Sequence, residues 1–469
     1  MYRFFYCLAL MLLPLIGRSQ ASQSACDCAS VLEESIQKVT TIYAGFDDKR
    51  TPATRNQYTR LLNQVRQQAP KAADERACYE VLRQYTDFFR DSHISVWFST
   101  HSSPNKLRRV KLETLPRKLA TQATGLEGIW VTADHKQRFA ICQDPSAINQ
   151  FIAVTLASSD SAWVPGMVKA EIYRYNEHAK RYQGLFYQPN FNGFLDGFKV
   201  SENRIDHLFG PVWYRQGREA ETPKPQPLVE FKILNPQFIY LRLARFDQGD
   251  VQQLDSLLKA NRRVIAQTRN LIIDLRGNGG GNASSSDEMI RLIYTNPIIY
   301  PSWQYRSCPE LIKATQTYIA KLQAQPGNND WMLKRQGALL SALQAHPGQL
   351  VRGGEDLTRK VDSTTSLPQR IAFLLDGNCG SSTEFFAFEG KQSKKVTTFG
   401  SNTHGVMDYG QAQSFTLACG QYILGIPWGR NGWIERFGYR IDNVGFPPDV
   451  RIPANESDWV GFVMRYWKE

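Results

Sequence analysis

Two adjacent serines stand where an apolar segment gives way to a helical pattern. The stretch IAFLLDGNCGSSTEFFAFEG, residues 371–390, reads as a buried strand, a turn with glycines and the start of a helix. Ser381 or Ser382 would then lie at a helix N-terminus, where free N–H groups and the helix dipole stabilise developing negative charge. A serine in this place is either a nucleophile or a helix N-cap, and this stretch by itself favours the cap.

A glycine-rich loop favours the nucleophile over the N-cap interpretation. The stretch NLIIDLRGNGGGNASSSDE runs from an apolar strand at 271–275 into the glycine-rich residues 277–281 and then into a helix start. Glycines let backbone N–H groups approach a reacting atom, as an oxyanion hole requires. We expect this hole to use the N–H of Gly279 or Gly280 together with that of Ser382. A phosphate-binding loop is the alternative, but the Gly-Lys-Ser/Thr element is missing and no GxGxxG pattern follows a first strand.

Together the two stretches resemble the tail-specific, or C-terminal processing, serine peptidase family, which includes the tricorn core. In that family a strand ending in Asp-x-Arg-x-Asn-Gly-Gly precedes a second strand and a Ser-x-x-Glu helix start whose serine is the nucleophile. Ser381-Ser382-Thr383-Glu384 matches the second motif and places the nucleophile on Ser381. The resemblance covers about residues 228–455 and a shorter piece near 80–98. It implies a ClpP/crotonase-like α/β core that hydrolyses peptide bonds through an acyl-enzyme.

The family activates its serine in two ways. One branch uses a lysine from a Gly-x-x-Thr-x-Gly-Lys-Gly loop, but the lysine position is Val406 here. The tricorn-like branch takes a histidine from an upstream Ser-His pair and a carboxylate from a Glu-Asn-x-Gly-x-x-Pro-Asp segment near the end. By that resemblance His93 is the general base, Ser92 assists it by hydrogen bonding, and Asp442 supports the network. Asp442 stands where the family pattern has the longer glutamate.

Other residues near these motifs are assigned lesser roles. His404, in the loop after the nucleophile helix, is the alternative base. Glu384 and Asp449 recur in the family motifs and are interpreted as structural, fixing a helix start and a turn. Cys379 is not expected to be the nucleophile, because it lies in the turn before the helix. The remaining histidines are expected to face solvent: His101, His135, His178, His207 and His346.

The N-terminus predicts export. The stretch MYRFFYCLALMLLPLIGRSQASQS combines Arg3, an apolar run and then small and polar residues. The run is shorter than the ~20 residues that a spanning helix needs. We assign residues 1–21 to a signal peptide, with an uncleaved anchor as the alternative. The expected protein is periplasmic or extracellular, free or associated with the outer envelope, and no later segment predicts an integral membrane span.

The cysteines predict disulfides. Cys7 lies in the signal peptide, and the seven that remain permit up to three disulfides and one thiol in an exported chain. We expect Cys78 to pair with Cys26 or Cys28, tying the mature N-terminus to a helix. The Cys-x-Cys spacing without a matching pair is poor evidence for zinc, and neither a metal nor a cofactor is expected.

Hydrophobic periodicity divides the mature chain into segments. Residues 22–108 predict a helical cap that ends in the Asp-Ser-His strand, and residues 109–225 predict a β-rich domain of unknown role. Residues 226–469 alternate strands and helices, as the serine peptidase core requires. The expected fold class is therefore α/β, with an N-terminal helical segment and an inserted β-rich domain.

Composition narrows the class of partner. The net charge of +12 includes Arg3 and Arg18 of the signal peptide and comes from no dense Lys/Arg run, so nucleic acid is not expected. The expected partner is a protein or peptide substrate, and the sequence leaves the oligomeric state open. Two other functions compete. One is a catalytically inactive family member that binds peptides or hydrophobic ligands; the other is a crotonase-type acyl-thioester enzyme, which export argues against.

Overall fold

The structure is a computed structural model of the chain. It describes residues 26–468 except positions 92, 326, 328 and 454 and residues 99–107, 117–118, 120–124, 145–149, 177–180, 188–192, 208–211, 219–226 and 362–365. The predicted signal peptide, residues 1–21, lies outside the described residues, and so does Ser92. In the part of the chain that is described, no helix has the length and apolarity to cross a membrane.

Helices form the N-terminal cap. They are α1 (Cys28–Ile42), α2 (Phe46–Lys49), α3 (Arg55–Gln68), a 3₁₀ turn at Ala69–Lys71 and α4 (Glu75–Asp87). The side chains of Asp27 and Asp74 accept N–H groups from the first turns of α1 and α4, as N-caps do. The apolar faces of these helices share one core with Tyr422 and Leu424, so the cap packs against a C-terminal strand.

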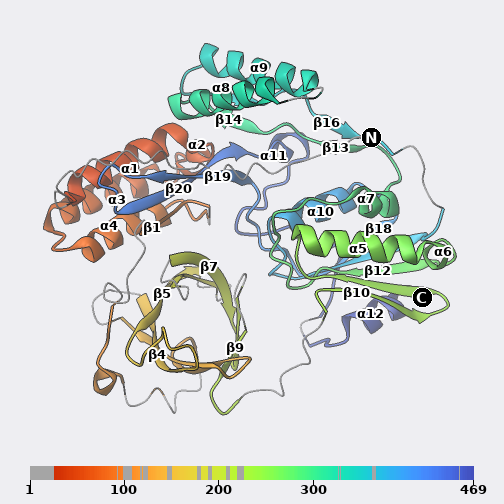
Figure 1. Cartoon of the computed structure of the whole chain (residues 1–469), viewed down its shortest axis with the longest axis horizontal. Helices are drawn as coiled ribbons and strands as arrows, with labels where there is room; N and C mark the ends of the chain where they lie inside the picture. The colour runs from red at the N-terminus through yellow and green to blue at the C-terminus, as the bar shows by residue number, and fades with distance from the viewer. Residues whose placement is uncertain are drawn as a thin grey trace.

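The β-rich segment is a closed antiparallel barrel, visible below the cap in Figure 1. Its strands are β2 (Gly128–Thr132), β3 (Gln137–Gln143), β4 (Gln150–Ser158), β5 (Val168–Asn176), β6 (Arg181–Tyr187), β7 (Gly193–Val200), β8 (Arg204–His207) and β9 (Trp213–Arg215). Aromatic side chains fill the interior. The prediction for His207 was wrong: its side chain is 2% exposed, and Nδ1 lies 2.9 Å from Asp196 Oδ2. His135 and His346 are exposed as predicted, whereas His101 and His178 lie outside the described residues.

The predicted α/β core is built on a sheet in the order β10-β11-β12-β17-β18-β21. Its strands are β10 (Val229–Asn235), β11 (Phe238–Leu243), β12 (Asn270–Asp274), β17 (Arg370–Leu375), β18 (Val396–Gly400) and β21 (Val450–Arg451). β10 is antiparallel to β11, and the other neighbours are parallel. Because adjacent parallel strands end at the same sheet edge, the loops after β12 and β17 meet there.

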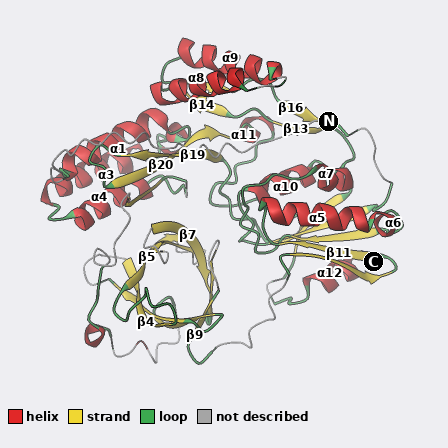
Figure 2. Cartoon of the chain, in the orientation of Figure 1, coloured by secondary structure: helices red, strands yellow, loops and turns green. Residues whose placement is uncertain are grey.

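Helices cover both faces of this sheet (Figure 2). One face packs against α5 (Gln248–Ala260), α6 (Arg262–Ile265), α7 (Asp287–Ile293) and α10 (Ser382–Lys391), and the other against α12 (Trp459–Tyr466). Alternation along the strands explains the layering, since Leu271 and Ile273 face the first layer while Ile272 faces the second. The fold class predicted from the sequence is confirmed.

A second, antiparallel sheet joins the two ends of the chain. It contains β1 (Ser95–Phe98), β20 (Tyr422–Arg430), β14 (Gln304–Arg306), β15 (Leu350–Arg352) and β19 (Tyr409–Thr416). Beside it lie β13 (Ile298–Tyr300), β16 (Leu357–Arg359), the short helix α11 (Trp433–Arg436) and a hairpin of α8 (Pro309–Ala324) and α9 (Asp330–Ala345). His93 lies two residues before β1, so the pairing of β1 with β20 brings it to the C-terminal half.

Disulfides reinforce the same connection. Cys28 pairs with Cys78, which confirms the predicted link between the N-terminus and a helix. Cys26 pairs with Cys419, which the sequence did not predict and which fastens the cap to the turn between β19 and β20. Among the described residues, Cys142, Cys308 and Cys379 are buried thiols.

Candidate active site

Ser381 occupies an unusual backbone conformation at the start of α10. Its φ is 53° and its ψ is −120°, and its side chain makes no capping hydrogen bond to the helix. A positive φ is costly for a residue with a Cβ and is found where function or tight packing requires it. The N-cap interpretation therefore does not account for Ser381. Ser382 begins the helix, and its Oγ donates to Gly281 O at 2.9 Å.

The glycine loop lies directly against this turn. A Cβ added at Gly280, whose φ is +103°, would lie 2.6 Å from Ser381 Cβ, so no larger residue fits without a shift. Asn278 holds the two loops together: its carbonyl oxygen accepts Gly380 N at 3.1 Å and Thr383 Oγ1 at 2.9 Å. The side chain of Asn278 also accepts the N–H of Gly280 at 3.0 Å. That N–H is thus already engaged, which leaves Gly279 and Ser382 as the better candidates for an oxyanion hole.

His93 is held by Asp91, a residue that the sequence had not singled out as a site residue. Asp91 is 4% exposed, and its Oδ1 accepts His93 N at 2.9 Å and lies 3.4 Å from His93 Nδ1. Its Oδ2 accepts Tyr43 Oη–H at 2.8 Å. Burial lowers the pKa of His93, but Asp91 first, and then the charges of Glu384 and Asp442, raise it above its ordinary value.

Backbone hydrogen bonds connect the segment of Asp442 with the serine turn. Asn443 N donates to Gly405 O at 2.9 Å, and His404 N donates to Cys379 O at 2.8 Å, two residues before Ser381. The charges of Glu384 and Asp442 both act on His93. The joint role of Ser381, His93 and Asp442 stays a prediction, and Ser92 lies outside the described residues.

Asp442 contacts Lys49 and Asn443. Its carboxylate accepts a hydrogen bond from Lys49 Nζ of the cap and one from Asn443 Nδ2 at 2.9 Å. Asn443 Nδ2 also donates to Arg90 O at 2.7 Å, next to Asp91. Burial raises the pKa of Asp442 to about 7, and Lys49 opposes that rise. Asp91 contacts His93 directly, so Asp442 belongs to the network through Lys49 and Asn443.

Glu384 organises the loop that carries the alternative base. It is fully buried and accepts Thr403 Oγ1 at 2.6 Å, Gly405 N at 2.7 Å and Val406 N at 3.0 Å. His404 N donates to Cys379 O at 2.8 Å, and His404 Cε1 would lie 3.7 Å from a Cβ at Gly197 of β7. The barrel wall therefore reaches the serine turn.

The remaining family-motif carboxylate, Asp449, is structural. Asp449 accepts the N–H and Oγ1–H of Thr398, both at 2.8 Å, and pairs with Lys391. These contacts fix the segment before β21 against β18.

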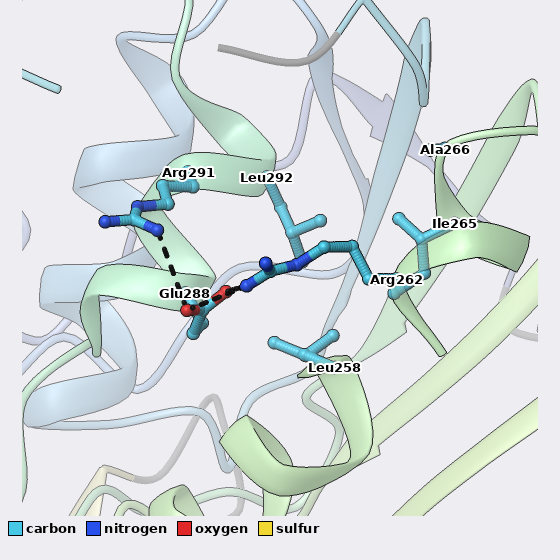
Figure 3. A pocket seen from close by; sticks show the side chains of 7 residues that line it. All are labelled: Leu258, Arg262, Ile265, Ala266, Glu288, Arg291 and Leu292. Atoms are coloured by element: carbon cyan, nitrogen blue, oxygen red, sulfur yellow. Dashed lines mark hydrogen bonds and ion pairs between the residues drawn. The ribbon is translucent and has the colours of Figure 1, made fainter. Parts of the chain in front are cut away.

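A small cavity elsewhere in the core does not compete with this site. It lies between α5, α6 and α7 and is about 70 Å³ in volume, well below the ~300 Å³ of typical ligand pockets. Figure 3 shows Glu288 at this cavity between Arg262 and Arg291. The Glu288 carboxylate lies 3.4 Å from Arg262 Nη2 and 3.7 Å from Arg291 Nη1. The charged groups at the cavity are thus paired with one another, and the cavity is too small for a peptide.

Comparison with known proteins supports a peptidase. No curated protein matches the chain. Mature CPAF has a similar structure, with a TM-score of 0.52 at 12% identity, over 94% of this chain and 96% of that chain. CPAF complexed with lactacystin gives 0.50 at 12% identity, over 94% and 97%. Residues 237–452, the segment that holds the glycine loop, Ser381 and Asp442, match Peptidase family S41.

Proposed function

We propose that the chain is an exported serine-type peptidase in which Ser381 is the nucleophile and His93 the general base. The observation that carries the proposal is the strained backbone of Ser381 at the start of α10, pressed against Gly280. The match of residues 237–452 to Peptidase family S41 supports the reaction class. The disulfides support the export, because disulfides persist in oxidising compartments.

The reaction proceeds by acyl transfer. Ser381 Oγ gives its proton to His93 and attacks the carbonyl carbon of the scissile peptide bond. The oxyanion that forms is stabilised by the N–H groups of Gly279 and Ser382 and by the dipole of α10. The C–N bond then breaks, and the leaving amine takes the proton from His93.

Water completes the cycle. It gives a proton to His93 and attacks the acyl carbon; the ester bond breaks, the product acid leaves and Ser381 regains its proton. Asp91 stabilises the imidazolium that forms in each half-reaction, because its carboxylate lies beside Nδ1. The proposed steps use no metal and no cofactor.

A fluorophosphonate probe tests the nucleophile and its base. Only an activated serine reacts readily with such a probe, so we expect labelling at Ser381 in the mature protein, located by peptide mapping. Ser381→Ala and His93→Ala should abolish it, and Ser382→Ala should retain it. Lactacystin, present in one of the CPAF structures, is a second probe for the same serine.

The other outcomes are equally informative. Labelling that survives His93→Ala but not His404→Ala would move the base to His404. No labelling of a folded wild type would contradict the proposal and favour the alternative of an inactive family member that binds peptides or hydrophobic ligands.

A further inference from the structure

Lys49 is a cap residue whose ammonium reaches the C-terminal part of the candidate site. It ends α2, its side chain is 12% exposed, and Nζ hydrogen-bonds the Asp442 carboxylate, which is 393 residues away in the sequence. Nζ also lies 5.3 Å from the ring centroid of Tyr409, where a cation is favoured. Two independent contacts therefore fix the ammonium in place.

The other charges on α2 have partners of their own. Asp47 pairs with Arg306, and Asp48 pairs with Arg430 and accepts Tyr409 Oη–H at 3.0 Å. Each of these aspartates is thus compensated within the cap and the second sheet. The ammonium of Lys49 is left to act on Asp442.

Other buried carboxylates hold the segments next to Asp442. Asp408 is 2% exposed and accepts Trp433 Nε1, Ile441 N and Asp442 N at 2.7–3.0 Å. Asp91 is satisfied by Tyr43 and by the N–H of His93. Glu384 is satisfied by the loop that it anchors. Neutral donors thus serve three of the carboxylates, whereas Asp442 receives a cation.

The charges of Asp91 and Asp408 disfavour ionisation of Asp442. A buried carboxylate without a counter-charge takes up a proton or displaces its neighbours. The charge of Lys49 favours the ionised forms of both carboxylates: it contributes to the lowered pKa of Asp91 and opposes the rise that burial causes in the pKa of Asp442. Asn443 Nδ2 connects the two carboxylates, because it donates to Asp442 and to Arg90 O next to Asp91. Loss of the Lys49 charge would therefore favour the protonated form of Asp91, which stabilises the imidazolium of His93 less well.

We propose that Lys49 is a positioning residue for the reaction at Ser381: its ammonium neutralises Asp442 and keeps Asp91 ionised beside His93. This inference rests on the proposed function of Ser381 and His93. It assigns the cap a part in the chemistry, since the cap supplies Lys49 and Asp91, and it gives Asp442 a role that requires no direct contact with His93.

The test is the rate constant of fluorophosphonate labelling at Ser381 as a function of pH. The proteins are the wild type, Lys49→Met, Lys49→Arg and the double variant Lys49→Met/Asp442→Asn. Lys391→Met is the matched control. The side chain of Lys391 is 10% exposed, close to the value for Lys49, and its Nζ lies 2.9 Å from Asp449 Oδ1, a carboxylate outside the proposed network. Thermal unfolding checks that each variant is folded.

We expect Lys49→Met to be labelled about tenfold more slowly or worse, as for a residue within a coupled ion-pair network. Lys49→Arg should restore most of the rate, because it restores the charge. The double variant should react faster than Lys49→Met, because no uncompensated carboxylate remains. Lys391→Met should react at the wild-type rate.

Three results would overturn the inference: a wild-type rate in Lys49→Met, equal slowing in Lys391→Met, or a double variant no faster than Lys49→Met. Labelling of the wild type and of Lys49→Met distinguishes failure of this inference from failure of the proposed function. If the folded wild type is not labelled at Ser381, the proposed function fails and the role of Lys49 fails with it. If the wild type is labelled and Lys49→Met matches it, only the role of Lys49 is refuted.

Discussion

Asp91 raises the pKa of His93 in a place where burial alone would lower it. A buried imidazole favours its neutral form, which lowers its pKa, whereas the neighbouring carboxylate favours the imidazolium. In this chain the carboxylate outweighs burial, and the pKa of His93 lies above its ordinary value while that of Asp91 lies below. A base must be unprotonated to accept the proton of Ser381, so activity should rise with pH through the pKa of His93.

Asp91→Asn should change this pH dependence in a defined direction. The amide removes the negative charge and leaves the burial, so the pKa of His93 should fall and the rising limb of kcat/KM should move to lower pH. The plateau should fall by about 10²- to 10⁴-fold, the usual contribution of an oriented general base. A pH–rate profile measures both effects.

Asp74→Asn is the matched control for Asp91→Asn. Asp74 is the N-cap residue of α4 in the same helical segment, and Asn serves as an N-cap as well as Asp does. The pH–rate profile of Asp74→Asn should therefore equal that of the wild type. A rising limb that stays in place in Asp91→Asn would show that Asp91 does not set the pKa of His93.

At the scale of elements, the site depends on two loops that leave neighbouring parallel strands. β12 and β17 pair along their whole length, so their carboxyl ends present the glycine loop and the serine turn side by side. Asn278 then binds the turn through its carbonyl group. The strained φ of Ser381 is held by these contacts, and it should persist only while the glycine loop keeps its close approach.

Gly280→Ala tests that approach. The added Cβ would meet Ser381 Cβ at 2.6 Å and Gly380 O at 2.8 Å, so the turn must move. Because reacting groups displaced by about 1 Å lose about 10²-fold in rate, we expect at least that loss in labelling or hydrolysis.

Gly277→Ala controls for backbone strain alone. Gly277 has a φ of +76°, and a Cβ there would meet nothing within 4 Å. Both variants should be destabilised by about 1 kcal/mol or more, since alanine is strained at positive φ, but only Gly280→Ala should lose activity. Equal activity losses would mean that strain, and not contact with Ser381, is responsible.

At the scale of the whole molecule, the candidate site is assembled from both ends of the chain. The cap supplies Asp91, His93 and Lys49, and the core supplies Ser381 and Asp442. The connection rests on the β1–β20 pairing, on a shared apolar core and on the Cys26–Cys419 disulfide. Opening of the cap would therefore separate Ser381 from His93, its proposed base.

The disulfides should differ in their contribution to stability. Cys26–Cys419 spans 393 residues and Cys28–Cys78 spans 50. If loop closure in the unfolded chain governs the effect, Cys26→Ser/Cys419→Ser should lose about 2 kcal/mol more free energy of unfolding than Cys28→Ser/Cys78→Ser. Denaturant unfolding of the two double variants measures the difference, and the reverse order would contradict this account.

The sequence by itself determined the local parts of this protein. A strand, a glycine turn and a helix start follow from periodicity and turn residues over about twenty positions, so Ser381 and the glycine loop could be found without a structure. The α/β core with its helical cap and inserted β-rich domain followed from the same periodicity. The partner of Cys78 was narrowed to two cysteines.

Only the tertiary structure decided which groups accompany these parts. The approach of Lys49 to Asp442, and of Cys26 to Cys419, joins residues about four hundred positions apart, and no local pattern carries that information. The engagement of the Gly280 N–H and the burial of His207 depend in the same way on the packing around them. Short-range propensities fix elements, whereas the pairing of charges and donors is fixed by which surfaces those elements bury against one another.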